Sequence, residues 1–366
     1  MRTLLTALTA ALTLGACSTL PTEQPDQMLR QAMKRQFTHD NQYRFNGEMR
    51  FTMPNLGQTE DESWVKHFMD SLSLPVSGAV DLPAGKVEMT AEIRYRHPNV
   101  LASVKLPILL DMKQAALYAD ARAVTTITDL LDKKYIPKVG DKMLKLSLPE
   151  EERKQFPLKT LAKALPEAFD QSWASLPKER FQLREMDEYG KQSGAAYRVG
   201  YRANGNDSMR MGQAFGDSLS KQLEQQGGEE GISAENYQKA VELLKKIGQL
   251  YHHPAKLLSS DIPAEEQEKM QQTMQKSMQE MEMDDDVYLD RKGRMVARKM
   301  TVFSTIDDSD KKLHATIMSR LQYGKPQFTL QPDENNTLNV NCIFDKSPCP
   351  WESSEREGGK GQTDKP

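Results

Sequence analysis

Apolar and polar residues alternate strictly along the segment that begins at Tyr43. The apolar positions are Tyr43, Phe45, Gly47, Met49, Phe51 and Met53, and the polar positions between them are Arg44, Asn46, Glu48, Arg50 and Thr52. A period of two places successive side chains on opposite faces of an extended chain. The segment is therefore predicted to be a β-strand with one apolar and one solvent-exposed face.

The same alternation returns three times further along. The apolar rows run through 76–82, 87–95 and 100–110, and two turns separate them, Pro83-Ala84-Gly85 and His97-Pro98-Asn99. A loop carrying Trp64 is expected before the first of these strands. Consecutive strands joined by tight turns predict an antiparallel meander, whose apolar face has to be covered.

The apolar face of the meander is expected to be covered by segments whose apolar residues have the spacing of a helix. A short helix is predicted at 27–37, and further short helices at 121–132 and 150–175, interrupted by Pro157 and Pro166. After a strand at 195–202, apolar residues recur every four positions at Met211, Phe215, Leu219 and Leu223, and a further helix follows Ser233. Strands resume near Val287, with long ones at 295–306 and 313–323. This order of elements predicts the α+β class.

The first seventeen residues resemble the lipobox signal of bacterial lipoproteins. Arg2 is followed by an apolar run to Leu14, and the small residues Gly15 and Ala16 precede Cys17. The run is too short for a transmembrane anchor, which takes about 20 apolar residues. The resemblance implies cleavage before Cys17, lipid on its thiol and an acyl group such as palmitate on the new amino terminus. Ser18, where inner-membrane lipoproteins often carry Asp, favours an outer-membrane anchor facing the periplasm.

The net charge and the cysteine content narrow the classes of protein to which this chain can belong. The formal net charge is −3, which argues against a nucleic-acid partner. Besides Cys17 the chain has only Cys342 and Cys349, which are predicted to form a local disulfide in an oxidising compartment. Closing so short a loop stabilises by about 2.5 kcal/mol in the chain-entropy model.

The order of hairpins, helical block and long strands, ending in Tyr323-Gly324-x-Pro326-x-Phe328, resembles the LolA/LolB-like lipoprotein carriers and their mycobacterial LppX/LprG relatives. The resemblance covers about 28–332 and rests on element order. It implies a strongly curved antiparallel sheet, a half-barrel, wrapped around a helical block, with a helical insertion. It also implies an apolar cavity and no catalytic residues.

Mapped onto this chain, the resemblance selects a set of inward side chains as the cavity lining. They are Phe45, Met49, Phe51, Val80, Met89, Ile93, Val104, Leu106, Val302 and Ile317 on strands, with Phe215 and Leu219 on a helix. The competing interpretation is that these residues form ordinary core. Twenty methionines favour the cavity slightly, because thioether side chains adapt to flexible acyl ligands.

Other candidate chemistry finds little support. Met270, Met274, Met278 and Met281 share one helical face, which suits copper(I) but equally a core stripe. The run Asp284 to Asp286 lacks the EF-hand spacing. The chain has no HExxH, GxSxG, phosphate loop or dinucleotide motif, so no metal, cofactor or catalytic residue is predicted.

The predicted organisation has five parts. These are a signal peptide (1–16), a flexible tether (17–27), one α+β domain (28–332) with a helical insertion at about 206–283, a disulfide-stapled segment (333–351) and a disordered tail (352–366). Two functions follow: an envelope lipoprotein that binds a lipid, acyl chain or other amphiphile for transfer or sensing, or a non-enzymatic scaffold for an envelope protein partner. An enzyme is the third and weakest alternative.

Overall fold

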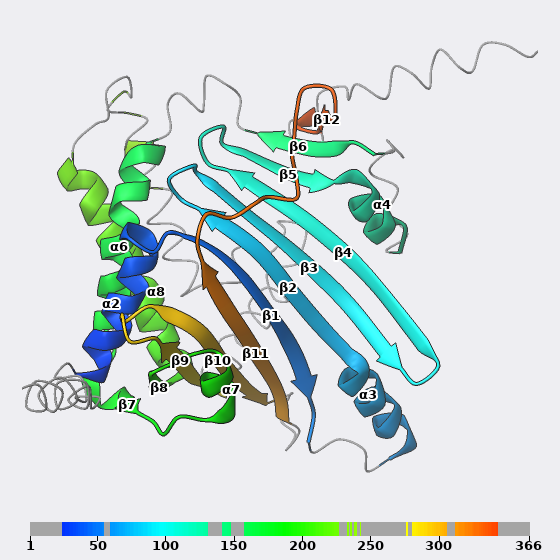
Figure 1. The fold of residues 1–366 in the computed structure, drawn as a ribbon, viewed down its shortest axis with the longest axis horizontal. Coiled ribbons are helices and arrows are strands. Elements are labelled where there is room, and N and C mark those ends of the chain that lie inside the picture. Colours follow the sequence, from blue (N-terminus) through cyan, green and yellow to red (C-terminus); the bar gives the residue numbers. More distant parts are fainter. Residues whose placement is uncertain are drawn as a thin grey trace, which may run out of the picture.

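The computed structural model describes residues 24–54, 59–130, 141–147, 157–226, 280–305 and 312–342, together with single positions between 233 and 276. Within them the fold is α+β, built on one large sheet with helices gathered mainly at one end of it (Figure 1). The lipobox, Cys17, Cys349, most of the helix predicted after Ser233 and most of the methionine stripe lie outside the described residues, while positions 235, 238, 239 and 242 of that helix are described and helical.

The sheet has twelve strands in the described part of the chain and is open, with the order β12-β6-β5-β4-β3-β2-β1-β11-β10-β9-β8-β7. Neighbouring strands are antiparallel except for the parallel pair β12 and β6, so the sheet is mixed rather than purely antiparallel. The strands are β1 (Gln42–Thr52), β2 (Leu72–Asp81), β3 (Lys86–His97), β4 (Val100–Asp111), β5 (Ala116–Asp120), β6 (Met143–Ser147), β7 (Phe181–Leu183), β8 (Tyr197–Asn204), β9 (Glu282–Leu289), β10 (Met295–Thr305), β11 (Lys312–Tyr323) and β12 (Thr337–Asn339).

The predicted meander is confirmed, because β1 to β6 are neighbours in chain order. At the β1 edge of the meander, β11 pairs with β1 along the whole strand, with Tyr43 opposite Tyr323 and Phe51 opposite Ala315. The register therefore keeps the predicted apolar rows in phase from one strand to the next. We call the face that carries these rows the apolar face.

The helices are α2 (Pro25–Thr38), α3 (Glu60–Ser71), α4 (Ala121–Leu130), α6 (Leu158–Ala174), α7 (Glu188–Gln192) and α8 (Gly205–Gln226), with a single 3-10 turn, η1 (Lys178–Arg180). α2, α6 and α8 lie together beside the β7 to β9 end of the sheet (Figure 1). α3 lies against β1 to β3 and α4 against β4 and β5. Among the described helices, α2, α6 and α8 thus form a helical block over one end of the apolar face, while α3 and α4 contact the sheet singly.

The main core lies where this block meets the sheet. Leu29 and Met33 of α2 and Trp173 of α6 pack against Val199, Tyr201 and Val287 of the apolar face. The indole of Trp173 meets the ring of Tyr201 edge-on at 5.0 Å between centroids. Burial of such large side chains stabilises by about 1.5–3 kcal/mol each. This cluster is the best-packed part of the apolar face.

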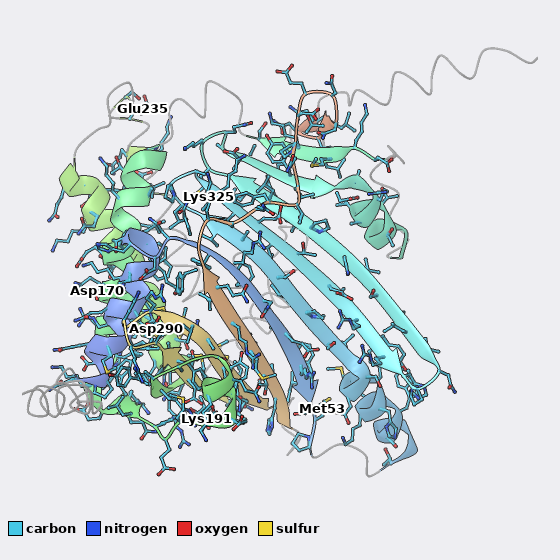
Figure 2. The ribbon with its side chains drawn as sticks, viewed as in Figure 1. Met53, Asp170, Lys191, Glu235, Asp290 and Lys325 are labelled. Atoms are coloured by element: carbon cyan, nitrogen blue, oxygen red, sulfur yellow. The ribbon has the colours of Figure 1, made fainter. Side chains whose placement is uncertain are left out.

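An ion pair fixes α2 on α6. Both Nε and Nη2 of Arg30 donate to the carboxylate of Asp170, at 2.8 and 2.7 Å. Asp170 is labelled in Figure 2, on the helix that packs beside α2. Such bidentate pairs are the strong form of an Arg–carboxylate contact.

The chain from β11 to β12 crosses the opposite face of the sheet. Glu88 accepts hydrogen bonds there from the backbone N–H groups of Thr329 and Leu330 and from the Thr329 hydroxyl, at 2.7–2.8 Å. Phe328 and Leu330 pack on Leu109 and its neighbours. The sheet continues beyond this crossing, because β12 joins β6, so the predicted separate segment at 333–351 contributes a strand to the main sheet.

Several sequence predictions need correction. The loop expected around Trp64 is the helix α3, and Pro166 lies inside the continuous helix α6 instead of ending it. Tertiary packing outweighs the loss of one helical hydrogen bond, because Ala164 and Ala168 are buried against α8 on either side of Pro166. Four short strands, β5, β6, β7 and β12, have no counterpart among the sequence predictions. The strand expected to resume near Val287 already begins at Glu282, so the aspartates 284–286 belong to β9.

Candidate functional site

The ten strand residues predicted to line a cavity all lie on the apolar face. Phe45, Met49 and Phe51 of β1 are in register with Leu321, Ile317 and Ala315 of β11. On the other side, Val80 pairs with Tyr43, while Met89, Ile93, Val104 and Leu106 follow on β3 and β4. Val302 of β10 pairs with Ala315 of β11. The structure thus brings these ten residues together on one surface.

That surface is buried at one end and open at the other. Near the helical block, Val199, Val287 and Leu289 are completely buried. On β3 to β5 the same face carries side chains that are 38% (Met89), 53% (Ile93), 40% (Leu110) and 38% (Leu117) exposed. Large exposed apolar patches on a folded chain mark ligand, partner or membrane contacts. We call the β3 to β5 part the open apolar surface.

Two of the predicted residues lie elsewhere. Phe215 and Leu219 belong to α8, where they join the cluster that α6 and α8 share. The ring of Phe215 meets that of Phe169 of α6 at 4.9 Å. The four-residue stripe correctly indicated a buried helix face, but that face packs on another helix. Val80, although on the apolar face, is also buried.

An aromatic ladder borders the open apolar surface. Trp64 stacks on Phe68 within α3, and Phe68 stacks on Tyr95 of β3, with ring centroids 5.8 and 5.5 Å apart. Trp64 is nevertheless 68% exposed. The spacing of Trp64 and Phe68, four residues apart, is the sequence signal that could have identified this helix.

One ion pair interrupts the apolar face. Asp285 of β9 is completely buried, and its Oδ2 accepts hydrogen bonds from Nε and Nη2 of Arg298 on β10, at 2.8 and 2.5 Å. The Tyr201 hydroxyl donates to the same oxygen at 2.8 Å. Sequence reasoning did not select any of the three. The alternation of β10 could have revealed Arg298, because it shares a side with Met300 and Val302.

The pKa values at this pair reflect burial and charge together. Burial raises the pKa of Tyr201 well above its usual value, and the charge of Asp285 raises it further. For Arg298 burial alone would lower the pKa, but the charge of Asp285 and its hydrogen bonds outweigh burial and raise it. The guanidinium therefore stays charged and the phenol stays neutral at any physiological pH.

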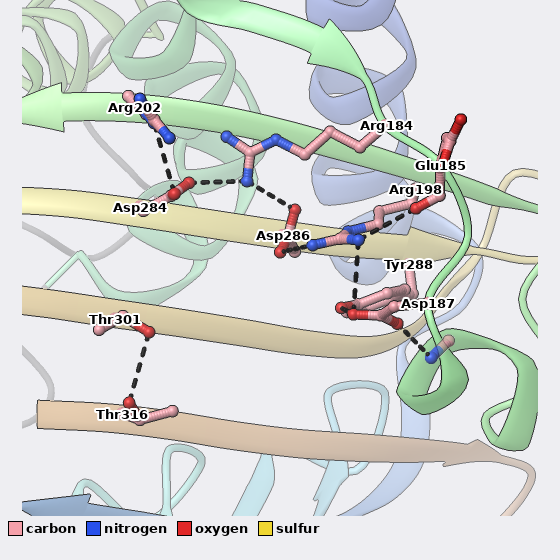
Figure 3. A network of polar contacts seen from close by, with 11 residues as sticks. Arg184, Glu185, Asp187, Arg198, Arg202, Asp284, Asp286, Tyr288, Thr301 and Thr316 are labelled. Carbon is pink, nitrogen blue, oxygen red and sulfur yellow. Dashed lines mark hydrogen bonds and ion pairs between the residues drawn. The ribbon is translucent and has the colours of Figure 1, made fainter.

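The opposite face of the same strands carries a larger charged network (Figure 3). Asp286 accepts from Arg184 at 2.9 Å and from Arg198 at 2.6 Å, and Arg184 also pairs with Asp284 at 2.7 Å. A Cβ at Gly200 would lie 2.0 Å from Nε of Arg184, so glycine makes room for this side chain. Each arginine has a carboxylate partner, which makes the network a structural clamp and leaves no free charge for a ligand.

Hollows are present, but they are not lined by the predicted set. One of about 740 Å³ lies at the strand ends, with Arg180, Asp284 and His314 among its lining residues, and none of the twelve predicted residues contributes to it. Another, of about 460 Å³, lies under the chain segment near Thr329 and includes only Phe45 of the set. The predicted residues thus contribute little to these two hollows.

Among the described residues there is no candidate metal site and no free thiol. Within the described ranges, no three His, Cys, Asp or Glu side chains are grouped so that they could hold a metal ion. Cys342 is buried and disulfide-bonded. Its expected partner, Cys349, is outside the described residues, so the pairing of these two stays a prediction.

Comparison with known proteins gives no family for this chain. No family model, curated protein or solved structure matches it. Among the helices described, none is both long and apolar enough to cross a bilayer.

Proposed function

We propose that this chain is an envelope lipoprotein whose apolar face binds a lipid, an acyl chain or another amphiphile for transfer or sensing. One observation carries the proposal: beyond the Asp285–Arg298 pair, the apolar face continues from a buried core into a surface where Met89, Ile93 and Leu110 are each more than a third exposed. A face of aliphatic and thioether side chains suits an acyl chain, which needs area and little directional bonding.

We also propose that the sheet curves as a half-barrel of the LolA/LolB-like kind, so that the open apolar surface is the wall of a cavity. The helical insertion at about 206–283 contributes to the cover. The observation in support is the position of α2, α6 and α8, which lie against this face and not the opposite one.

Attachment to the membrane is proposed to occur through the lipid on Cys17. Two or more acyl chains hold a protein on a bilayer almost permanently, whereas one chain holds it only marginally. The pattern Leu14-Gly15-Ala16-Cys17 and Ser18 after it support an anchor in the outer membrane, facing the periplasm. Replacing Cys17 by alanine should move the chain from the membrane fraction to the soluble fraction, and an unchanged membrane fraction would contradict the anchor.

The binding activity can be tested with two matched substitutions of apolar residues by glutamate. Ile93→Glu places a charge on the open apolar surface, and Leu101→Glu places one on the opposite face of the adjacent strand, where residue 101 is paired with Arg96. Both positions are more than half exposed, so both variants should fold. The full chain carrying Cys17→Ala supplies a background without covalent lipid.

We expect Ile93→Glu to weaken binding of oleic acid, measured by calorimetric titration, by at least tenfold, or about 1.4 kcal/mol. Leu101→Glu should bind as the parent does. Circular dichroism and the urea midpoint serve as folding controls. Equal binding by both variants would remove the support for the open apolar surface as the ligand site.

A non-enzymatic scaffold is the second candidate function. The exposed ladder of Trp64 and Phe68 favours it, because aromatic residues are enriched at protein interfaces. A scaffold would carry no bound lipid and would instead capture a defined envelope protein through α3.

A further inference from the structure

The charges on the apolar face are confined to one place. Following the register from β7 to β12, the inward positions of the described strands carry no acidic or basic side chain other than Asp285 and Arg298, apart from the imidazole of His97 at the far end of β3. A buried ion pair contributes little net stability compared with apolar residues of similar size, because two charges lose their hydration. The pair therefore calls for an explanation other than packing.

The geometry leaves part of the guanidinium available. Nε and Nη2 both converge on one oxygen of Asp285, and Nη2 also approaches the Tyr201 hydroxyl at 3.4 Å. Nη1 donates to no described residue, and the Arg298 side chain is 32% exposed although its partner is fully buried. Arginine has five N–H donors in a fixed plane, so the pair with Asp285 holds this plane in place and still leaves donors for a second acceptor.

Arg298 also lies between the covered and the open parts of the face. It pairs with Ser319 of β11, which in turn pairs with Gly47 of β1, so small residues continue its row across the sheet. Longer side chains, Met300 with Ile317 and Met49, form the adjacent row. An acyl chain that follows these rows from β1 would bring its head group to the guanidinium.

We infer that Arg298 is the head-group site of the proposed ligand and selects amphiphiles with an anionic head, a carboxylate or a phosphate. This inference rests on the proposed function, because it concerns the polar end of the same ligand. Asp285 acts as a positioning residue: it fixes the guanidinium and is shielded from the ligand by its own burial. Charge-assisted hydrogen bonds in a partly desolvated site are worth about tenfold in affinity.

The test compares ligands that share one acyl chain and differ in the head. Oleic acid, oleoyl lysophosphatidic acid and oleyl alcohol are titrated calorimetrically into the full chain carrying Cys17→Ala. The parent should bind the two anionic ligands about tenfold more tightly than the alcohol. The better of the two anions then identifies the head as a carboxylate or a phosphate.

Two variants separate head-group recognition from folding. Arg298→Leu with Asp285→Leu removes both charges, so no buried charge is left unpaired. It should lose the tenfold preference and keep the affinity for oleyl alcohol. Arg294→Leu removes a guanidinium from the nearby turn, where Arg294 pairs with Asp290, and should keep the preference.

The outcomes are distinct. If the parent binds oleic acid and oleyl alcohol equally, or if the double variant keeps the preference, the inference about Arg298 is overturned while acyl binding still supports the proposed function. If no ligand binds the parent, the proposed function and this inference fail together.

Discussion

The two ends of the apolar face have the same sequence pattern and different environments. At the covered end, Leu289 is fully buried under α2 and α6, whereas at the open end Leu110, also an inward leucine on a strand, is 40% exposed. Strand β8 at the covered end and strand β3 at the open end both alternate apolar and polar residues. The difference lies in the helical block, which packs over β7 to β9 and reaches Met295 of β10 and Leu321 of β11 in the described part of the chain.

This difference shows what an alternating pattern specifies. It determines which side of a strand avoids water, because one face must lie away from solvent in the folded state. It does not determine what covers that side. The covered end therefore behaves as core, and the open end is available for a ligand or a partner.

The largest expected contrast comes from one substitution made at each end. Leu289→Ala should lower the free energy of unfolding by about 3–4 kcal/mol, because it leaves a cavity in a packed cluster. Leu110→Ala should lower it by less than about 1 kcal/mol, because its side chain is already partly hydrated. Urea midpoints of the two variants give the comparison, and similar losses would mean that the open end is core.

The ion pair between the two ends gives the next largest effect. Arg298→Leu should lower the free energy of unfolding by about 3 kcal/mol, because it leaves the buried carboxylate of Asp285 unpaired. Adding Asp285→Leu should restore most of this loss, since no buried charge remains. A double-mutant cycle of urea midpoints measures the coupling. Additive losses would show that the two residues do not act as a pair.

The clamp on the opposite face of the covered end predicts a smaller, pH-dependent effect. Burial would raise the pKa of Asp187, but hydrogen bonds from the Gly190 N–H and the Tyr288 hydroxyl, with the charge of Arg198, lower it overall. Stability from this carboxylate is therefore present above about pH 4 and is lost as pH falls through the lower folded pKa.

Asp187 also caps α7, so Asp187→Ala should cost about 1 kcal/mol at pH 7. The deficit should shrink below about pH 3, as shown by urea midpoints measured across the acid range. Asp187→Asn, which keeps an acceptor at the cap, is the control and should lose less. A deficit that is the same at pH 3 and pH 7 would remove the ionised carboxylate from the explanation.

The smallest effect is expected at the border of the open end. Trp64→Ala should change the free energy of unfolding by no more than about 0.5 kcal/mol, because the indole is largely in water. Trp173→Ala, its counterpart at the covered end, should cost about 3–5 kcal/mol. A large loss for Trp64→Ala would mean that the aromatic ladder is part of a core.

Much of the sheet could be predicted from the sequence because its signal is local. The period-two rows around Phe45, Met89 and Val104 give both the strands and the shared face, and the tight turns give the antiparallel order. Short strands such as β5 and β6 could not be predicted from the sequence, because they lack a long alternating run. The parallel pairing of β12 with β6 joins residues almost two hundred positions apart, and no local pattern encodes it.

The candidate site was predictable only in part. The ten strand residues were placed together correctly, because register follows from alternation. Phe215 and Leu219 were not, because a helical stripe shows that a face is buried but not against which element. Arg298 was overlooked because a charged residue on a strand is ordinarily read as solvated, and its partner Asp285 becomes its neighbour only through the pairing of β9 with β10.

The central claim is that the open apolar surface holds an amphiphile. The most direct measurement is native mass spectrometry, with organic extraction, of the full chain carrying Cys17→Ala after purification from its own host's periplasm. We expect a stoichiometric lipid that survives purification, with an anionic head group. A compact chain that carries no lipid would contradict the claim and favour the scaffold instead.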